Sequence, residues 1–509
     1  MLDFLIKGAR VIDGNLTDSY IGDIGIEKDR IITKDLDNSN SKEIIDGNNK
    51  IICPGFIDVH SHDDFRVVND KRILHNLCQG ITTMIVGNCG FGVSPIISAK
   101  EQMSSLYQVS KLANEWKNFG EYFDMLDNYP TSINVGALIG HHTIRRDALS
   151  IIDKNYPSEE ELNKMVNLVE EGMESGCLGF STGLVYEPGR NSKTEEIIEL
   201  TKAIKKYNGI YVSHMRNEAE GLFHSIRETA NIGLSADVKV EISHLKCVGK
   251  SNWGNSVKAL SMIDEYSKKG LDIHADQYPY TARSTMLKAL LINGTFNNDP
   301  NSPMGKSDSN EVLLCSVPGD KSLEGKTLED IQHVYDLPTE ETVKKLISEV
   351  SDKILVAAFG MEENDVRNIM QHPKVMIGTD GIDVGSKPHP RAWGTYPRLL
   401  DEYVNNQKIL SFEKAINKMT KLPAQKFNIK QRGEIKHNYF ADLVIFDPEN
   451  IKDNSTFTNP KKTPDGIEYI FVNCKKLIGR RTKSGHLIKD DKEFCSYLLE
   501  KGQVAVVPG

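Results

Sequence analysis

Residues Pro54-Gly55-Phe56-Ile57-Asp58-Val59-His60-Ser61-His62 form an apolar run that ends in two histidines one residue apart. If the run is a β-strand, its side-chain period of two places His60 and His62 on the same face. Both imidazoles can then reach one metal ion. The stretch therefore predicts the first strand of the fold and the beginning of a metal site.

Seven further apolar runs follow, and they alternate with longer polar segments that suit helices. This alternation is typical of a parallel sheet with covering helices, and eight strands are the number in a (β/α)8 barrel. The sequence predicts an α/β fold built on such a TIM-like barrel, with helices at 158–175 and 194–207. The predicted strands are 56–60, 83–87, 134–139, 178–181, 210–214, 239–244, 271–275 and 375–380.

Short strand-like runs also occur near both ends of the chain. They predict a small β-sandwich domain built from residues 1–52 and 430–509, beside a catalytic barrel at 53–429. The segment at roughly 288–350 interrupts the strand rhythm before the eighth strand. It includes 293–310, which is rich in Asn, Asp, Ser and Pro, and a predicted helical piece at 339–350. We expect this segment to be an insertion over the barrel mouth. The apolar run 354–359 just after it competes for assignment as a barrel strand.

Composition narrows the functional classes. The formal net charge of −9 gives no support for a nucleic-acid or anionic-membrane partner. The start of the chain lacks a signal-peptide pattern, and no apolar run approaches the roughly 18 residues of a membrane span. The eight cysteines include no CxxC pair, which fits reduced thiols. We expect a cytoplasmic protein that acts on a small molecule, and the sequence does not predict its oligomeric state.

Residues able to bind a metal gather at the carboxyl ends of the predicted strands, where barrel enzymes build their active sites. Each has an ordinary structural explanation: a hydrogen-bonded histidine, a small buried cysteine, or an aspartate that caps a turn. Six such coincidences on one rim are improbable, so together they predict a metal centre. The candidates are His60, His62, Cys89, His214, His244 and Asp380.

The HxH pair after the first strand, histidines on the fifth and sixth, and an aspartate on the eighth resemble the amidohydrolase superfamily. Members such as dihydroorotase, hydantoinase and urease bridge two metals with a carboxylated lysine at the end of strand four. Here that strand, 178–184, contains no lysine. The Gly87-Asn88-Cys89-Gly90 motif offers a thiolate instead, and this resembles the D-aminoacylase (N-acyl-D-amino-acid deacylase) branch. Further similar motifs are 213–218, 243–246, 276–285 and 389–395.

The resemblance implies a zinc-dependent hydrolase that cleaves the amide bond of N-acyl-D-amino acids. Cys89, His214 and His244 would hold one tightly bound Zn²⁺. A second, weaker site would use His60, His62 and Asp380 and share Cys89. Asp380 would act as general base and then as general acid. The residues that would bind the carboxylate of the amino acid are Lys246, Tyr278, Ser284 and Arg391.

Other interpretations stay open at this point. The chain could hydrolyse cyclic amides or dipeptides, as a hydantoinase-like or D-dipeptidase-like enzyme, or it could be a non-catalytic scaffold with an amidohydrolase barrel. Stereochemical preference rests on the resemblance alone. We interpret Arg216 and Glu218 as an ion pair that orients His214. The His141-His142 pair is interpreted as pocket lining or as structural, because the metal positions are already filled.

Overall fold

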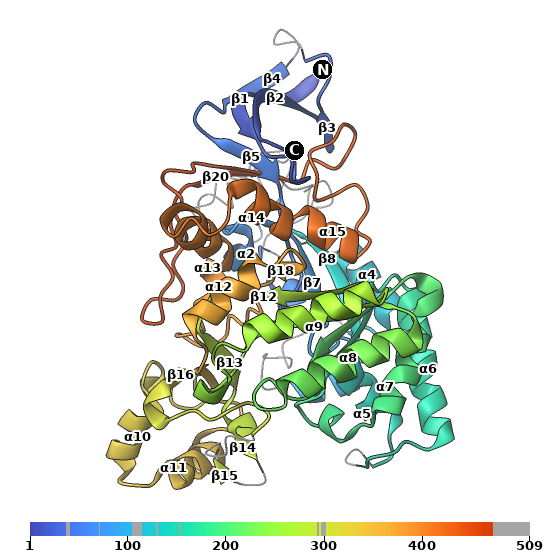
Figure 1. Ribbon diagram of the computed structural model, residues 1–509, viewed down its shortest axis with the longest axis vertical. Coiled ribbons are helices and arrows are strands. Elements are labelled where there is room, and N and C mark those ends of the chain that lie inside the picture. Colours follow the sequence, from blue (N-terminus) through green and yellow to red (C-terminus); the bar gives the residue numbers. More distant parts are fainter. Residues whose placement is uncertain are drawn as a thin grey trace.

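Three parts of the chain are arranged along the long axis of the molecule (Figure 1). A β-sheet that contains the N-terminus lies at one end, the barrel with its helices lies in the middle, and a smaller α/β layer lies at the other end. The computed structural model describes residues 1–36, 41–70, 72–103, 115–128, 131–151, 154–292, 295–296 and 302–471. No helix in these ranges combines the length and the apolar character needed to cross a bilayer.

The central sheet is a parallel barrel. Its strands follow one another in chain order, and a parallel bridge between Ser61 and Gly381 joins the last strand to the first. Each of the eight predicted strands is present, so the predicted barrel is confirmed. The observed strands are β6 (Phe56–Asp58), β7 (Ile81–Val86), β8 (Asn134–Gly140), β9 (Gly179–Gly183), β10 (Ile210–His214), β11 (Lys239–Ile242), β12 (Ile273–Gln277) and β18 (Val375–Ile377).

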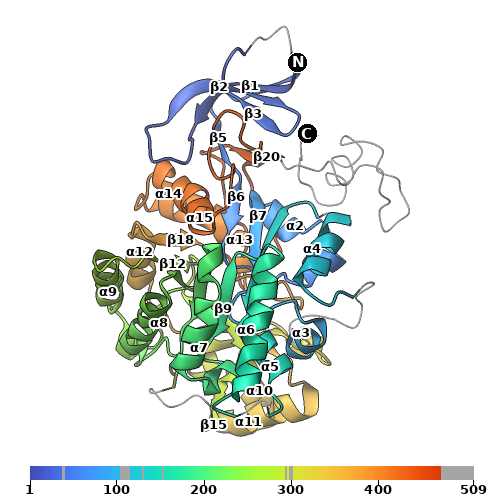
Figure 2. The ribbon, with the colours of Figure 1, turned by 90° about the vertical axis from the view of Figure 1, so that its right-hand side faces the viewer.

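Amphipathic helices cover the barrel and bury their apolar faces against it (Figure 2). Ser158 and Glu161 form the predicted capping box at the start of α6. The predicted helix 194–207 is α-helical only as far as Lys202 and continues as a 3-10 turn at Lys205–Tyr207. The main covering helices are α5 (His141–Ala148), α6 (Glu159–Glu174), α7 (Thr194–Lys202), α8 (Leu222–Ala236), α9 (Ser256–Lys268), α12 (Glu363–Gln371), α13 (Arg391–Arg398), α14 (Phe412–Met419) and α15 (Lys421–Lys426). The shorter helices are α1 (Arg66–Asn69), α2 (Leu74–Leu77), α3 (Ile96–Met103) and α4 (Phe119–Asn128).

The terminal sheet joins both ends of the chain. β5 pairs with β1 on one side and with β19 on the other, and the sheet has an apolar core of its own. Its strands are β1 (Leu2–Val11), β2 (Tyr20–Glu27), β3 (Arg30–Ile32), β4 (Ser41–Asp46), β5 (Ile51–Pro54), β19 (Leu443–Phe446) and β20 (Ile467–Phe471). The domain boundaries at 52 and 430 stay a prediction, and residues 472–509 of that domain lie outside the described ranges.

The segment before the eighth strand forms a separate layer. Its centre is a three-stranded antiparallel sheet of β13 (Ala282–Met286), β17 (Leu355–Phe359) and β16 (Val312–Ser316). The run 354–359 therefore belongs to this layer and not to the barrel. The layer also contains β14 (Leu291–Ile292), β15 (Thr295–Phe296), α10 (Leu328–Tyr335), α11 (Thr339–Lys345) and the π-helical turn Leu346–Val350. Its sheet extends on both sides of the predicted insertion 288–350, of which 293–294 and 297–301 are not described.

The seam between the first and last barrel strands is held by polar contacts. Thr379 donates to Asp58 through its backbone N–H (2.9 Å) and its hydroxyl (2.6 Å). The hydroxyl of Tyr396 lies 2.9 Å from the carbonyl of Ile57 and 3.0 Å from that of Ile377, so it contacts both strands at once. These contacts fix the backbone from which His60 and Asp380 project.

We predict that Tyr396→Phe lowers the free energy of unfolding by about 1–3 kcal/mol, because two buried carbonyls at the seam lose their donor. A urea titration followed by circular dichroism measures the change. Tyr156→Phe is the matched control, since Tyr156 is 66% exposed and its hydroxyl is outside the core. Equal unfolding midpoints for the two variants would contradict the role of Tyr396 at the seam.

Candidate metal centre and substrate pocket

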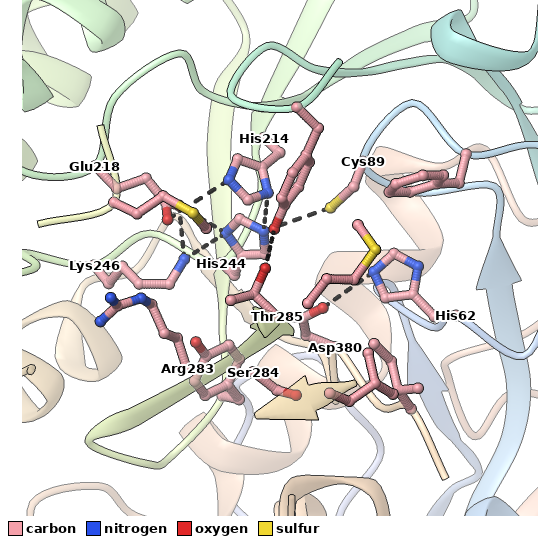
Figure 3. Close-up of a pocket in the computed structure, with 17 residues that line it drawn as sticks. His62, Cys89, His214, Glu218, His244, Lys246, Arg283, Ser284, Thr285 and Asp380 are labelled. Atoms are coloured by element: carbon pink, nitrogen blue, oxygen red, sulfur yellow. Dashed lines mark hydrogen bonds and ion pairs between the residues drawn. The ribbon is translucent and has the colours of Figure 1, made fainter. Parts of the chain in front are cut away.

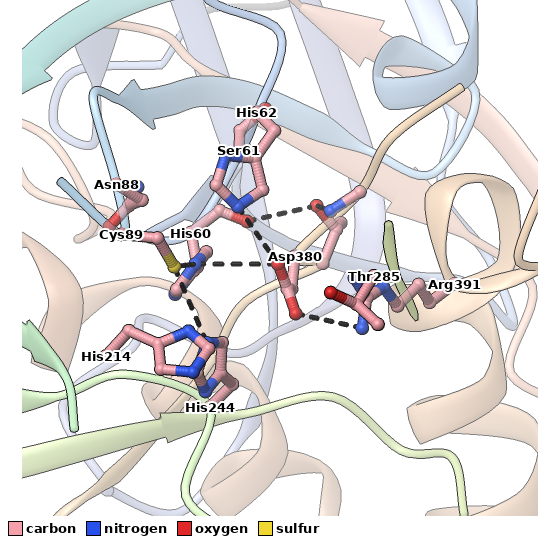
Figure 4. A network of polar contacts seen from close by, with 12 residues as sticks. His60, Ser61, His62, Asn88, Cys89, His214, His244, Thr285, Asp380 and Arg391 are labelled. Atoms are coloured by element: carbon pink, nitrogen blue, oxygen red, sulfur yellow. Dashed lines mark hydrogen bonds and ion pairs between the residues drawn. The ribbon is translucent and has the colours of Figure 1, made fainter. Parts of the chain in front are cut away.

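The six predicted ligand residues come together at the carboxyl ends of the barrel strands (Figure 4). All six side chains are buried. Sγ of Cys89 lies 3.3 Å from Nε2 of His60 and 3.5 Å from Nε2 of His244. Nε2 of His244 lies 2.9 Å from Nδ1 of His214. Oδ1 of Asp380 lies 3.1 Å from Nε2 of His62 and 3.6 Å from Nε2 of His60.

Three of these residues have an unusual backbone. The φ angles of Cys89, His244 and Asp380 are 54°, 36° and 47°, in the left-handed region that residues other than glycine rarely adopt. Each lies within a few residues of a strand end, where a left-handed residue turns the chain sharply. Such conformations carry a cost and tend to occur at functional sites. Here they aim the three side chains at one point.

Close backbone contacts require glycine at both glycine positions of the Gly87-Asn88-Cys89-Gly90 motif. A Cβ atom on Gly87 (φ 84°) would lie 2.2 Å from the carbonyl oxygen of Leu138. One on Gly90 (φ 78°) would lie 2.9 Å from the backbone nitrogen of Gly183. The Asn88 amide donates to the backbone carbonyls of β7 and of the segment after β6. The motif is therefore a tight turn that presents Cys89 to the barrel axis.

The same turn explains why the fourth barrel strand, β9, has no lysine at its end. Gly183 ends β9, and a Cβ atom there would lie 2.2 Å from the carbonyl oxygen of Cys89. A side chain at this position, including a lysine, would collide with the cysteine turn. The space at the end of the fourth strand is therefore taken by the chain segment that supplies the thiolate.

Burial and charge act in opposite directions on the acidic groups of the cluster. Burial by itself raises the pKa of the Cys89 thiol, but the imidazoles of His60 and His244 hold that pKa well below its usual value. Burial also opposes ionisation of Asp380, and the Arg391 guanidinium 2.8 Å away keeps the pKa of Asp380 well below the usual range. The surroundings therefore favour the thiolate form of Cys89 and the carboxylate form of Asp380.

This donor set fits a transition metal. Thiolate and imidazole are preferred ligands of Zn²⁺, and carboxylate oxygen is also accepted. Nε2 of His214 and Nδ1 of His62 are buried and have no hydrogen-bond partner within the described ranges. Three overlapping groups each bring three ligand atoms within 4.8 Å of one another: His60, Cys89 and His244; His60, His62 and Asp380; His214, Glu218 and His244.

A surrounding set of acidic residues orients the histidines. Oδ2 of Asp276 lies 3.1 Å from Nδ1 of His60, and Oδ1 accepts from the backbone N–H of His244 at 2.9 Å. Oε1 of Glu218 lies 3.0 Å from Nδ1 of His244. Such contacts fix the ring orientation of ligand histidines. Our reasoning from sequence gave Asp276 no role, although it follows the seventh predicted strand directly.

The predicted ion pair between Arg216 and Glu218 is wrong. Arg216 pairs with Glu228 on α8 at 2.9 Å. Glu218 instead accepts from Nζ of Lys246 at 2.6 Å. The two side chains point to different partners because the chain after β10 turns between them. Glu218 still contacts His214, with Oε2 3.6 Å from Nε2 of that ring, and its Oε1 also lies 3.0 Å from Nδ1 of His244.

A pocket opens over the cluster (Figure 3). Of the predicted substrate-binding residues, Lys246, Tyr278 and Ser284 line it. Arg391 lies behind Asp380, with its guanidinium 4.5 Å from the centre of the Tyr278 ring. Nζ of Lys246 also lies 2.7 Å from Nδ1 of His244. The full lining is His62, Cys89, Phe91, Tyr186, His214, Glu218, His244, Lys246, Tyr278, Arg283, Ser284, Thr285, Met286, Met304, Leu355, Asp380 and Ile382.

Sequence reasoning missed two prominent pocket residues. The ring of Tyr186 packs edge-on against His214 with centroids 5.0 Å apart. The other residue is Arg283, which lies one residue before Ser284. Its only signal in the sequence was its place inside the motif 276–285. The histidine pair at 141 and 142 does not line the pocket. His141 contacts Glu196 at 2.8 Å, and Nε2 of His142 lies 2.9 Å from the carbonyl oxygen of Gly183, so both are structural.

Comparison with known proteins finds similar chains over nearly the full length. The chain is 34% identical to a D-aminoacylase from Alcaligenes xylosoxydans xylosoxydans, over 92% of this chain and 93% of that protein. It is 32% identical to an N-acyl-D-aspartate deacylase of the same organism, over 94% and 93%. The structure of an N-acyl-D-glutamate deacylase from Bordetella bronchiseptica, complexed with zinc and a phosphonate inhibitor, is 31% identical and superposes with a TM-score of 0.84, over 93% and 95%.

A solved structure of D-aminoacylase, described as having a binuclear metal centre, is 33% identical and also has a TM-score of 0.84, over 93% of this chain and 96% of that one. Residues 43–266 and 328–473 match the profile of the amidohydrolase family. The matched regions contain all six candidate ligands. The chain belongs to the amidohydrolase family and, within it, to the D-aminoacylase branch.

Proposed function

We propose that this protein is a zinc-dependent hydrolase of N-acyl-D-amino acids, which releases a carboxylate and a D-amino acid. The observation that carries the proposal is the cluster of Cys89, four histidines and Asp380 on the floor of a pocket lined with cationic and hydroxyl groups. The named activities of the similar proteins support the amide substrate and the D-configuration.

Cys89, His214 and His244 would hold the tightly bound zinc, and His60, His62 and Asp380 would form the weaker second position with Cys89. A bound zinc ion lowers the pKa of water to about 7 and polarises a carbonyl group. The chain supplies the remaining requirements. Glu218 and Asp276 keep the ligand rings oriented, and Tyr186 and Phe91 cover the cluster with aromatic surface.

Asp380 is positioned to move the proton. It is ionised at neutral pH because Arg391 lies beside it, so it can accept a proton from the attacking water. Oδ2 faces Arg391 and Oδ1 faces His62, and both contacts hold the carboxylate in one orientation. The same group can then donate that proton to the leaving nitrogen. General acid–base assistance of this kind contributes about 10²–10⁴-fold in rate.

The carboxylate of the amino acid would bind next to Asp380. Nε and Nη2 of Arg391 have no hydrogen-bond partner among the described residues. The Tyr278 hydroxyl is also buried and has no hydrogen-bond partner in those ranges. Lys246 retains hydrogen-bonding capacity after its contacts with Glu218 and His244, because an ammonium has three donors. Ser284 adds a hydroxyl to the pocket wall. Together these groups would anchor an anionic product in an acidic protein.

Two alternatives predict different results. A hydantoinase-like enzyme would act on cyclic amides, and solved hydantoinases share the fold with this chain at 14–15% identity. The missing lysine at the end of the fourth strand disfavours the lysine-bridged chemistry. A non-catalytic scaffold would have lost ligands, whereas all six candidates are present and buried.

We predict that the zinc-loaded protein hydrolyses N-acetyl-D-amino acids and that it leaves the L-enantiomers, hydantoins and dipeptides largely intact. A kinetic panel on enzyme of measured metal content tests this. Faster turnover of hydantoins or dipeptides than of any N-acyl-D-amino acid would favour the alternatives. Complete inactivity towards all of these amides would instead favour the scaffold.

We predict that Asp380→Ala lowers kcat by about 10²–10⁴-fold or more while one equivalent of zinc stays bound, because the tight site uses other ligands. Steady-state kinetics and elemental analysis of the same sample measure both quantities. Asp383→Ala is the control, since Asp383 is a nearby buried aspartate that pairs with Arg66 outside the cluster. An Asp380→Ala enzyme with near-normal turnover would exclude the general-base role.

A further inference from the structure

Arg283 is a buried cation in the pocket wall to which the proposed reaction gives no role. It is the second residue of β13, its side chain is only 3% exposed, and it lines the same pocket as Cys89 and Asp380. Nη2 donates to the hydroxyl of Ser307 at 3.0 Å. Nε and Nη1 are buried and have no hydrogen-bond partner within the described ranges. Burying a guanidinium with two unused donors costs free energy unless an anion binds to those donors.

The carboxylates of the pocket are already paired with other cations. Glu218 accepts from Lys246 at 2.6 Å, and Asp380 lies 2.8 Å from Nη1 of Arg391. Lys246 and Arg391 therefore each have a carboxylate partner. Arg283 is not within ion-pair distance of any described carboxylate. Because arginine stays protonated in proteins, the unmatched charge persists at every physiological pH.

The position of Arg283 separates it from the predicted site for the α-carboxylate. The leaving nitrogen must lie beside Asp380 to receive a proton, and the α-carboxylate carbon is only two bonds from that nitrogen. The adjacent cation is Arg391, which contacts Asp380 directly. Arg283 lies across the pocket beside Lys246, on the side opposite His62 (Figure 3). An anion that reaches Arg283 must belong to a more distant part of the substrate.

We propose that Arg283 binds a second carboxylate of the substrate, so that the preferred substrates are N-acyl-D-amino acids with an additional acidic group. This inference rests on the proposed function and narrows it. The second carboxylate can belong to the side chain of the amino acid or to the acyl group, since both are linked to the scissile amide. The unused N–H groups of Nε and Nη1 are charged donors, and a carboxylate is an acceptor that suits a guanidinium.

Overall sequence identity to known proteins does not decide whether acidic or neutral substrates are preferred. The chain is 34% identical to a D-aminoacylase and 32% identical to an N-acyl-D-aspartate deacylase, which is no meaningful difference. The charge balance of the pocket is the feature that distinguishes acidic from neutral substrates. A rival explanation is that Arg283 only fastens the insertion through Ser307.

The test compares kcat/KM for isosteric acidic and neutral substrates with zinc-loaded wild-type enzyme and Arg283→Met. One pair is N-acetyl-D-glutamate and N-acetyl-D-glutamine, with the aspartate and asparagine pair for a shorter side chain. Another is N-succinyl-D-leucine and its succinamoyl analogue, which moves the carboxylate to the acyl group. We expect the wild type to prefer the acidic member of one pair by about 10- to 100-fold, the range for a hydrogen bond to a charged group.

Arg283→Met should remove that preference by slowing the acidic substrate about 10- to 100-fold, with the neutral partner changed by less than about threefold. The pair that shows the effect identifies the source of the carboxylate. Lys250→Met is the matched control: Lys250 is also a cation near the insertion, but its side chain is 65% exposed and does not line this pocket. It should leave the preference unchanged.

If Arg283→Met lowers kcat/KM equally for acidic and neutral substrates, the proposal is overturned. Arg283 would then bind the α-carboxylate or serve only to stabilise the fold. A wild type without preference for the acidic member of any pair would overturn it as well, even if the variant does not fold. If zinc-loaded wild type hydrolyses none of these compounds, the proposed function itself fails, and this inference fails with it.

Discussion

The structure depends on keeping several ionisable groups buried next to one another. A thiol, four imidazoles and a carboxylate meet at the carboxyl end of the barrel, almost out of contact with water. Burial of such groups is unfavourable unless opposite charges, hydrogen bonds or a metal ion compensate. Backbone strain adds to the cost, because Cys89, His244 and Asp380 are all left-handed. Such an arrangement persists only because many contacts from the surrounding barrel hold these residues in place.

The barrel and the insertion divide the work. Every candidate ligand comes from the barrel, at or just after a strand end, and the seam contacts between Asp58 and Thr379 hold the first and last of these strands together. The added layer instead supplies one wall of the pocket, with Arg283 and Ser284 on β13. The candidate metal ligands therefore lie on the barrel, whereas the pocket wall combines residues of the barrel and of the added layer.

Much of this could be predicted from the sequence because the signals are local. Apolar runs identified the eight barrel strands, and the positions of the ligand-type residues after those runs identified the cluster. Side-chain partners were less predictable. Glu218 lies two residues from Arg216, yet it pairs with Lys246, which follows the next barrel strand β11, since parallel strands bring their carboxyl ends together. The unpaired state of Arg283 depends on long-range packing between β13, Ser307 and the pocket, for which the sequence has no local signal.

The central claim is that the Cys89 thiolate, with His214 and His244, binds the tight zinc. X-ray absorption at the zinc edge of the purified protein tests this most directly. We predict one zinc per chain with one sulfur neighbour at about 2.3 Å and nitrogen or oxygen neighbours at about 2.0–2.1 Å, and loss of both zinc and activity in Cys89→Ala. Cys53→Ala, which removes a buried cysteine of the terminal sheet, should keep both. A zinc shell of nitrogen and oxygen alone, or unchanged zinc content in Cys89→Ala, would contradict the account.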